Sequence, residues 1–110
     1  MINARYKLNI ALASKDFKPY YKGGFFSVKS KKNSLSNSRV GVIVSKKNSK
    51  TAVGRNMIKR LVMNFFKENK DFLDNMEPSL DFLIIILTTA SDIKDNKEAF
   101  TQELNNVISI

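Results

Sequence analysis

The sequence contains no cysteine, no histidine and no tryptophan among its 110 residues, and only two prolines. Without cysteine and histidine, the chain cannot form a disulfide framework, a zinc finger, an imidazole metal site or a Cys–His or Ser–His catalytic pair. A metal site would have to use carboxylates, and these are scarce where the chain is basic. We therefore expect no catalytic residues, no metal site and no tightly bound cofactor on this chain.

Long hydrophobic runs are also missing. The longest, Phe82–Leu87, has six residues, whereas a helix needs about 20 to span a bilayer. Near the N-terminus, the five-residue run Asn9–Ala13 is shorter than the apolar core of a signal peptide, which has about 7–15 residues. We expect a soluble cytoplasmic protein with no membrane partner.

Negative charge is scarce and unevenly placed. The chain has 19 basic and 10 acidic residues, a net charge of +9. Residues 1–70 hold 17 of the basic and two of the acidic residues, whereas residues 71–110 hold two basic and eight acidic residues. A surface built for solubility would mix the signs more evenly. The segregation indicates one face that meets a polyanion, although a charged surface without a partner remains the alternative.

The length predicts one domain, residues 14–110, preceded by a flexible N-terminal arm, residues 1–13. Ser14 is a candidate N-cap for a short helix that ends at Gly23–Gly24. Phe17, Tyr20 and Tyr21 have helical i, i+3, i+4 spacing, which places the three rings on one side.

Further along, residues 25–30 and 40–45 have strand patterns, and a basic loop leads from the second strand into a helix over residues 51–70. The apolar run 80–87 predicts a central strand covered on both faces. A last helix, capped by Ser91 or Asp92, completes an α+β fold of order αββαβα.

The helix over residues 51–70 has two contrasting sides. Its apolar residues cluster within about 140° of a helical wheel, and Gly54 on that side would allow close approach to the sheet. No acidic residue lies within four positions of Arg55, Lys59 or Arg60, so local ion pairs cannot neutralise the opposite side. With the preceding loop, this side forms what we call the cationic face: Lys46, Lys47, Lys50, Arg55, Asn56, Lys59 and Arg60.

These residue types suit a phosphate-rich partner. A helix N-terminus favours an anion, arginine binds phosphate through two parallel hydrogen bonds, and asparagine can donate to phosphate or to a sugar hydroxyl. Phe17 and Tyr21 are candidates for stacking on unpaired bases, but rings at helical spacing also occur in cores. The pattern favours RNA binding.

Two segments resemble the bacterial ribonuclease P protein component. Residues 39–47 (RVGVIVSKK) and 52–61 (AVGRNMIKRL) are similar to that family's R-hydrophobic-G-x-x-V-S-K-K and A-V-x-R-N-R-I-K-R-L patterns. Residues 15–17 (KDF), 20–23 (YYKG) and 80–86 (LDFLIII) match weaker family segments before and after them. One departure is Met57, which stands where the family usually has a second arginine and removes one charge from the helix.

The resemblance implies a two-layer α/β sandwich with a left-handed βαβ crossover. It also implies the protein subunit of a ribonucleoprotein endonuclease that removes the 5′ leader of precursor tRNA. In that enzyme the RNA subunit and its Mg²⁺ perform hydrolysis, and the protein is expected to be a monomer in a 1:1 complex with the RNA. The cationic face would contact ribonuclease P RNA, and Phe17 and Tyr21 would lie in a cleft that receives the leader.

Three other functions remain open. A general RNA- or ribosome-binding module would have the same electrostatics without a leader cleft. A metal-dependent nuclease acting alone would need the carboxylates of Asp71 and Asp74, or of Asp92 and Asp95, which lie in the acidic part of the sequence. A membrane-surface role for the basic helix conflicts with the expectation that its apolar side packs on the flanking strands.

Overall fold

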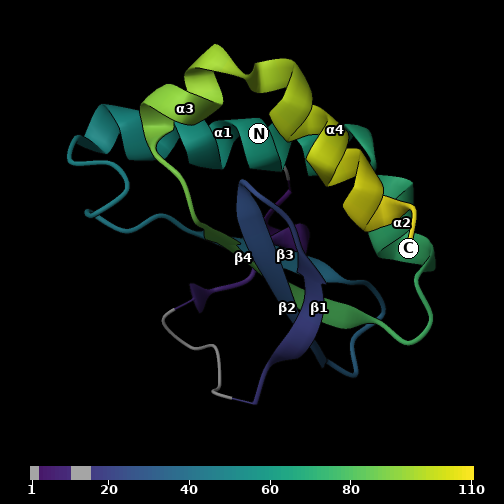
Figure 1. The fold of residues 1–110 in the computed structure, drawn as a ribbon. Coiled ribbons are helices and arrows are strands. Elements are labelled where there is room, and N and C mark those ends of the chain that lie inside the picture. Colours follow the sequence, from purple (N-terminus) through teal and green to yellow (C-terminus); the bar gives the residue numbers. More distant parts are fainter. Residues whose placement is uncertain (1–2, 11–15) are drawn as a thin grey trace.

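A mixed four-stranded sheet organises the protein, with the strands in the order β1-β2-β4-β3 (Figure 1). The computed structural model describes residues 3–10 and 16–110. Strand β2 pairs antiparallel with both β1 and β4, and β3 pairs parallel with β4. The strands are β1 (Lys18–Lys22), β2 (Phe26–Lys32), β3 (Arg39–Ile43) and β4 (Leu80–Ile86).

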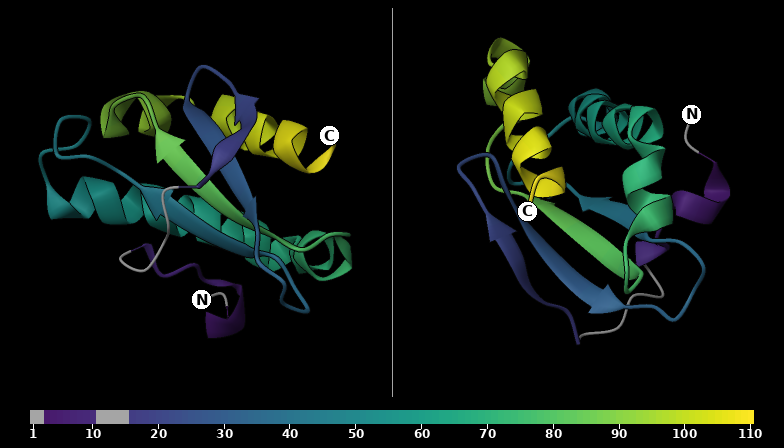
Figure 2. Two further views of the ribbon diagram at one scale, coloured as in Figure 1. Left: turned by 90° about the horizontal axis from the view of Figure 1, so that it is seen from below. Right: turned by 90° about the vertical axis from the view of Figure 1, so that its right-hand side faces the viewer.

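The α-helices cover one face of this sheet, as the views in Figure 2 show. Their apolar sides pack on buried sheet residues such as Phe26 and Ile84. The result is the α+β, two-layer arrangement that the sequence and the resemblance predicted. The helical elements are η1 (Ala4–Tyr6), α1 (Ala52–Glu68), α2 (Lys70–Asn75), α3 (Ala90–Asp95) and α4 (Lys97–Ile108).

Helix α1 confirms the predicted helix and its apolar stripe. Ile58, Val62 and Phe65 are buried, and Met57 and Leu61 pack partly buried against the same core. Helices α1 and α2 connect the parallel strands β3 and β4. The connection is the βαβ unit that the resemblance implied, and its left hand remains a prediction.

The prediction of a helix before Gly23 is wrong, because residues 18–22 form strand β1. Pro19 lacks a backbone donor and is unfavourable inside a helix, but it is tolerated in an edge strand. The strand pairs with β2 and has an irregular register between Pro19 and Tyr21. The ring of Tyr20 lies 5.1 Å from that of Phe82, and the ring of Tyr21 lies 5.8 Å from that of Phe26. The proposed N-cap Ser14 lies outside the described residues.

Two predictions for the C-terminal half also need correction. Strand β4 is central, but the helices cover one of its faces, so Leu83 and Ile85 are only half-buried. The last helix is two helices, α3 and α4, separated at Asn96, and the N-cap of α3 is Thr89 rather than Ser91 or Asp92.

Residues 3–10, here called the N-terminal segment, belong to the predicted arm and pack on the domain, while the flexibility of residues 1–13 remains a prediction. The Leu8 amide donates to the Val40 carbonyl at 2.9 Å, and Lys7 forms a parallel bridge with Val40 at the free edge of β3. Tyr6 is buried, and its hydroxyl donates to the Asp74 carboxylate in α2 at 2.8 Å. The segment thus extends the sheet edge beside α1.

Candidate nucleic-acid interface

The basic loop between β3 and α1 is held in place by side-chain hydrogen bonds. Asn48 donates its side-chain amide to the Ile86 carbonyl at 2.7 Å, which ties the loop to the end of β4. The Ser49 amide donates to the Ser45 carbonyl at 3.1 Å and closes the turn. Lys46 and Lys47 project from this turn and are exposed. Hydrogen bonds therefore tie the turn that carries both lysines to the rest of the fold.

Arg55 links the start of α1 to the same loop. Its guanidinium donates to the Ser49 carbonyl at 2.9 Å, while Thr51 caps the helix by accepting from the Gly54 amide at 3.0 Å. A Cβ built on Gly54 would lie 3.2 Å from the Ala90 Cβ, with the Ser49 hydroxyl closer still. Gly54 therefore permits contact with the loop and α3, not with the sheet as predicted.

The rest of the cationic face is open to solvent. Four more of its residues are exposed, and Arg55 is half-buried. The exposed ones are Lys50, Asn56, Lys59 and Arg60. No acidic residue of the described chain forms an ion pair with any cation of this face. The structure thus brings all seven predicted RNA-binding residues to one loop and the adjoining helix, without internal neutralisation.

Two acidic residues, Asp81 and Asp74, form hydrogen bonds with residues outside the cationic face. Asp81, which is buried, accepts from the Arg39 guanidinium through two hydrogen bonds of 2.8 and 2.7 Å. This interaction raises the pKa of Arg39. Hydrogen bonding to Asp74, followed by burial, raises the pKa of the Tyr6 phenol. These carboxylates hold the fold together and do not neutralise the cationic face.

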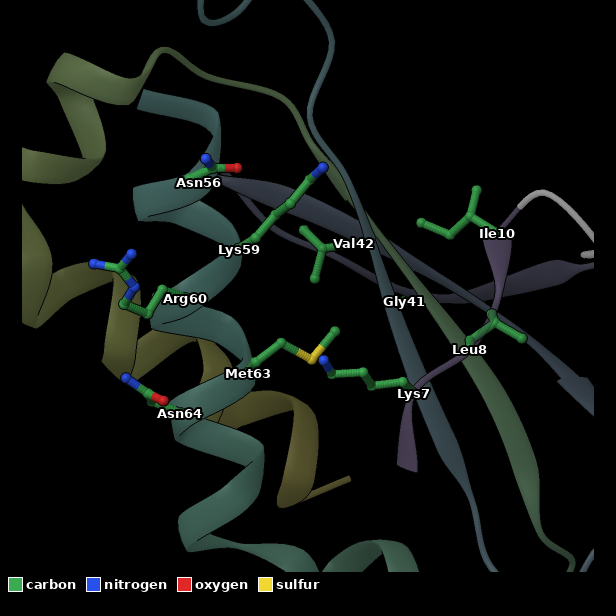
Figure 3. Close-up of a pocket in the computed structure, with 10 residues that line it drawn as sticks. All are labelled: Lys7, Leu8, Ile10, Gly41, Val42, Asn56, Lys59, Arg60, Met63 and Asn64. Carbon is green, nitrogen blue, oxygen red and sulfur yellow. The ribbon is translucent and has the colours of Figure 1, made fainter. Parts of the chain in front are cut away.

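A pocket lies between α1, β3 and the N-terminal segment (Figure 3). Its volume is about 380 Å³. Its apolar lining consists of Leu8, Ile10, Gly41, Val42 and Met63. The other lining residues are basic residues or asparagines: Asn56, Lys59 and Arg60 of the cationic face, and Lys7 and Asn64. The sequence interpretation missed the contribution of the N-terminal segment. The alternation of Tyr6, Leu8 and Ile10 with polar residues indicates one apolar side of this segment, although the segment forms a 3₁₀ helix and an isolated bridge rather than a strand.

The predicted leader-binding residues lie in and beside β1. Tyr21 lines a shallow groove of about 450 Å³, together with Lys22 and Lys29. Phe17 precedes β1, is half-buried and does not line this groove. Burial raises the pKa of the neighbouring Tyr20, which also lines the groove. Of the two rings predicted to bind the leader, the structure therefore places Tyr21, but not Phe17, in a groove lined by aromatic and basic residues.

Residues 3–10 and 16–110 contain no group of three acidic side chains close enough to bind a metal ion. Asp74 is engaged by Tyr6, and Asp92 accepts a hydrogen bond from the Thr88 hydroxyl at 2.6 Å. Of the helices described, none combines the length and apolar character that crossing a bilayer requires.

The ribonuclease P family model matches residues 13–110 of this chain. The chain belongs to the ribonuclease P protein family. The ribonuclease P protein component of Vibrio campbellii is 41% identical over 75 residues, which cover 68% of this chain and 59% of that relative. The corresponding protein of Aliivibrio fischeri is 37% identical over 81 residues, covering 72% of this chain and 66% of that relative. The chain thus spans about six-tenths of the length of these curated relatives.

Solved structures of the family have the same fold. The ribonuclease P protein of Thermotoga maritima, in complex with 1-(4-fluorophenyl)-2-thiourea, is 27% identical and superimposes with a TM-score of 0.70 over 86% of this chain and 85% of that chain. The Staphylococcus aureus ribonuclease P protein is 26% identical, with a TM-score of 0.60 and the same coverages. The family and the fold therefore agree with the resemblance of residues 39–47 and 52–61.

Proposed function

We propose that this chain is the protein subunit of a bacterial ribonuclease P, where it binds the catalytic RNA and assists removal of the 5′ leader from precursor tRNA. The observation that carries the proposal is the cationic face, which the described part of the chain does not neutralise. Membership of the ribonuclease P family supports it. The proposed complex contains one protein and one RNA subunit and acts in the cytoplasm.

In this complex the cationic face contacts phosphates. Lys46 and Lys47 project from a fixed turn, and Lys59 and Arg60 continue the positive surface along α1. Each lysine or arginine that contacts a phosphate releases condensed counterions, which is favourable at low salt. Arg60 can bind phosphate with two parallel hydrogen bonds, whereas Lys59 acts as a point charge. The face therefore supplies affinity without base sequence information.

Hydrolysis is assigned to the RNA subunit and its Mg²⁺. A surface of uncompensated cations repels a divalent metal ion, so the protein's own contribution is charge neutralisation and substrate contact. Neutralisation by the protein would replace part of the Mg²⁺ that the RNA otherwise needs to bring two polyanions together. The protein should therefore stimulate cleavage most strongly when Mg²⁺ is scarce.

Reconstitution with ribonuclease P RNA at low Mg²⁺ tests the proposal. The expected result is faster cleavage of precursor tRNA at the mature 5′ end when the protein is added. RNA binding without stimulation of cleavage would instead favour a general RNA- or ribosome-binding module. Cleavage by the protein in the absence of the RNA subunit would contradict the assignment of hydrolysis to the RNA.

Leader contact by Phe17 and Tyr21 is the second part of the proposal. Aromatic rings beside lysines are suited to unpaired nucleotides, because bases stack on the rings while the cations meet the phosphates. Phe17→Ala and Tyr21→Ala are each expected to weaken binding of precursor tRNA by about five- to 100-fold, the usual range for one stacked base, and to spare mature tRNA. Equal losses on both substrates would exclude a leader-specific role.

A further inference from the structure

The pocket between α1 and β3 combines an apolar lining with basic residues, and the phosphate contacts of the cationic face require only the basic residues. Its apolar lining includes Leu8 and Val42, which are 9% and 3% exposed, and the half-buried Met63. Lys7 and Lys59 lie at its opposite sides (Figure 3). Because phosphate binding uses only the cations, the apolar lining indicates a ligand that also has a flat or apolar part.

The pocket depends on the close approach of the N-terminal segment to β3. A Cβ on Gly41 would lie 3.1 Å from the Ile10 Cγ1 and 3.2 Å from the Leu8 Cβ. These contacts are tighter than ordinary packing, so the absence of a side chain at residue 41 lets the segment lie over the strand. The bridge between Lys7 and Val40 fixes the segment in that position. The pocket is therefore built by two separated parts of the chain.

Charge and size narrow the choice of ligand. No acidic residue lines the pocket, and Lys7 and Lys59 form no ion pair within the described part of the chain. A volume of about 380 Å³ is at the small end of ligand pockets, which range from about 300 to 1,000 Å³. A small anionic ligand with an apolar ring meets these conditions, and the amide of Asn56 at the rim can donate to or accept from a base edge.

We propose that this pocket receives one unpaired nucleotide of the RNA partner, a proposal that rests on the proposed function. The base lies against the Met63 thioether and the Val42 side chain, on the α1 side of the strand. Its flanking phosphates lie between Lys7 and Lys59. Figure 3 shows the Lys7 and Met63 side chains extending toward each other across the pocket, which places a cation next to the apolar lining.

The chemistry of the lining supports a base in particular. Enzymes and RNA-binding proteins hold extruded bases between aromatic or apolar side chains and read their edges with polar groups. A thioether makes favourable contact with an aromatic ring. A hydrophobic peptide would meet the same apolar lining, but it would leave Lys7 and Lys59 without an anion.

The methyl group of Met63 provides a direct test. Protein labelled with ¹³C at its methionine methyl groups would be titrated with a bacterial ribonuclease P RNA, and Met57 and Met76, which do not line the pocket, would serve as references. A base stacked on Met63 should move its methyl signal upfield, with small changes at the references. RNA binding with an unmoved Met63 signal would overturn the pocket assignment alone, whereas no RNA binding would overturn the proposed function as well.

Two further titrations distinguish other occupants. Free mononucleotides that move the Met63 signal when the RNA does not would indicate a free-nucleotide site and overturn the proposal. A shift that depends on protein concentration without RNA would indicate that a second copy of the chain occupies the pocket, and it would also overturn the proposal.

Substitutions give an independent measurement. Met63→Gln should weaken RNA binding about two- to tenfold, the range expected for one sulfur–ring contact, whereas Met63→Leu keeps the apolar lining and should retain affinity. Lys7→Gln should reduce the salt dependence of RNA binding by about one unit on a log–log plot. Lys97→Gln, the matched control in the acidic part of the chain, should leave it unchanged. Equal effects of Lys7→Gln and Lys97→Gln would contradict a phosphate contact at the pocket.

Discussion

The double variant Lys59→Gln/Arg60→Gln tests whether RNA is bound by the cationic face or simply by net charge. Both side chains are exposed and have no acidic partner in the described part of the chain. Their replacement should therefore change the free energy of unfolding by no more than about 0.5 kcal/mol. The matched control is Lys94→Gln/Lys97→Gln, which removes the same charge from α3 and α4.

The size of the effect follows from the number of cations on the face. Six lysines and arginines contribute (Lys46, Lys47, Lys50, Arg55, Lys59 and Arg60), which gives a slope of log affinity against log salt of about −4 to −5. Affinity of the unaltered protein should then fall about a thousandfold between 50 and 200 mM salt. Losing two contacts should reduce the slope by about 1.4 to 1.8, so the double variant should lose only about a hundredfold.

Filter binding or fluorescence anisotropy with ribonuclease P RNA at several salt concentrations measures these slopes. The control variant should keep the slope of the unaltered protein, because its lysines belong to α3 and α4 and not to the cationic face. Equal slope reductions in the two double variants would refute the reasoning. They would mean that the RNA responds to total charge and that no particular face of the protein is recognised.

Three further predictions concern the parts of the fold that support the interface. Arg39→Gln leaves the buried Asp81 carboxylate without its charged partner and should lower the free energy of unfolding by about 3 kcal/mol in urea denaturation. Because Asp74 raises the pKa of Tyr6, the stability that this phenol contributes should be present below its unfolded pKa of about 10 and lost as pH rises through the higher folded value. In an ultraviolet titration of the phenolates, Tyr6→Phe should remove a late-ionising tyrosine. Gly41→Val should push the N-terminal segment off β3 and speed hydrogen exchange of the segment's backbone amides about tenfold or more, while exchange in β4 stays slow.

Local sequence patterns predicted the parts of the fold whose structure is decided locally. The apolar stripe of α1 has helical spacing over several turns, so its buried side could be identified from Ile58, Val62 and Phe65. The same wheel identified the helical residues of the predicted cationic face, and the basic loop before the helix supplied Lys46, Lys47 and Lys50. Contact of these residues with RNA remains a prediction.

Strand β1 could not be predicted in the same way. The spacing of Phe17, Tyr20 and Tyr21 fits a helix, but residues 18–22 pair with β2 across the turn at Gly23. Aromatic residues have high strand propensity, and a partner strand outside the local window decided between the two structures. The groove lined by Tyr21 consequently has a strand as its wall.

The pocket was missed because it needs a contact between distant parts of the sequence. Gly41 is one position in the strand pattern of residues 40–45, and nothing in that pattern indicates that residues 8 and 10 lie over it. The division of the last helix at Asn96 was missed for a different reason: the apolar residues on both sides, Ile93 and Phe100, are buried in one core.

The arrangement of acidic side chains bears on how stable the protein is by itself. Asp74 and Asp81 are hydrogen-bonded to Tyr6 and Arg39, so neither is available to relieve repulsion among the lysines of the loop and α1. Such repulsion disfavours the compact state, and any polyanion that binds the folded form shifts the equilibrium toward folding. The melting temperature of the isolated chain should therefore rise with sulfate or polyphosphate. We expect bound phosphates to stabilise the native conformation of this chain in the same way.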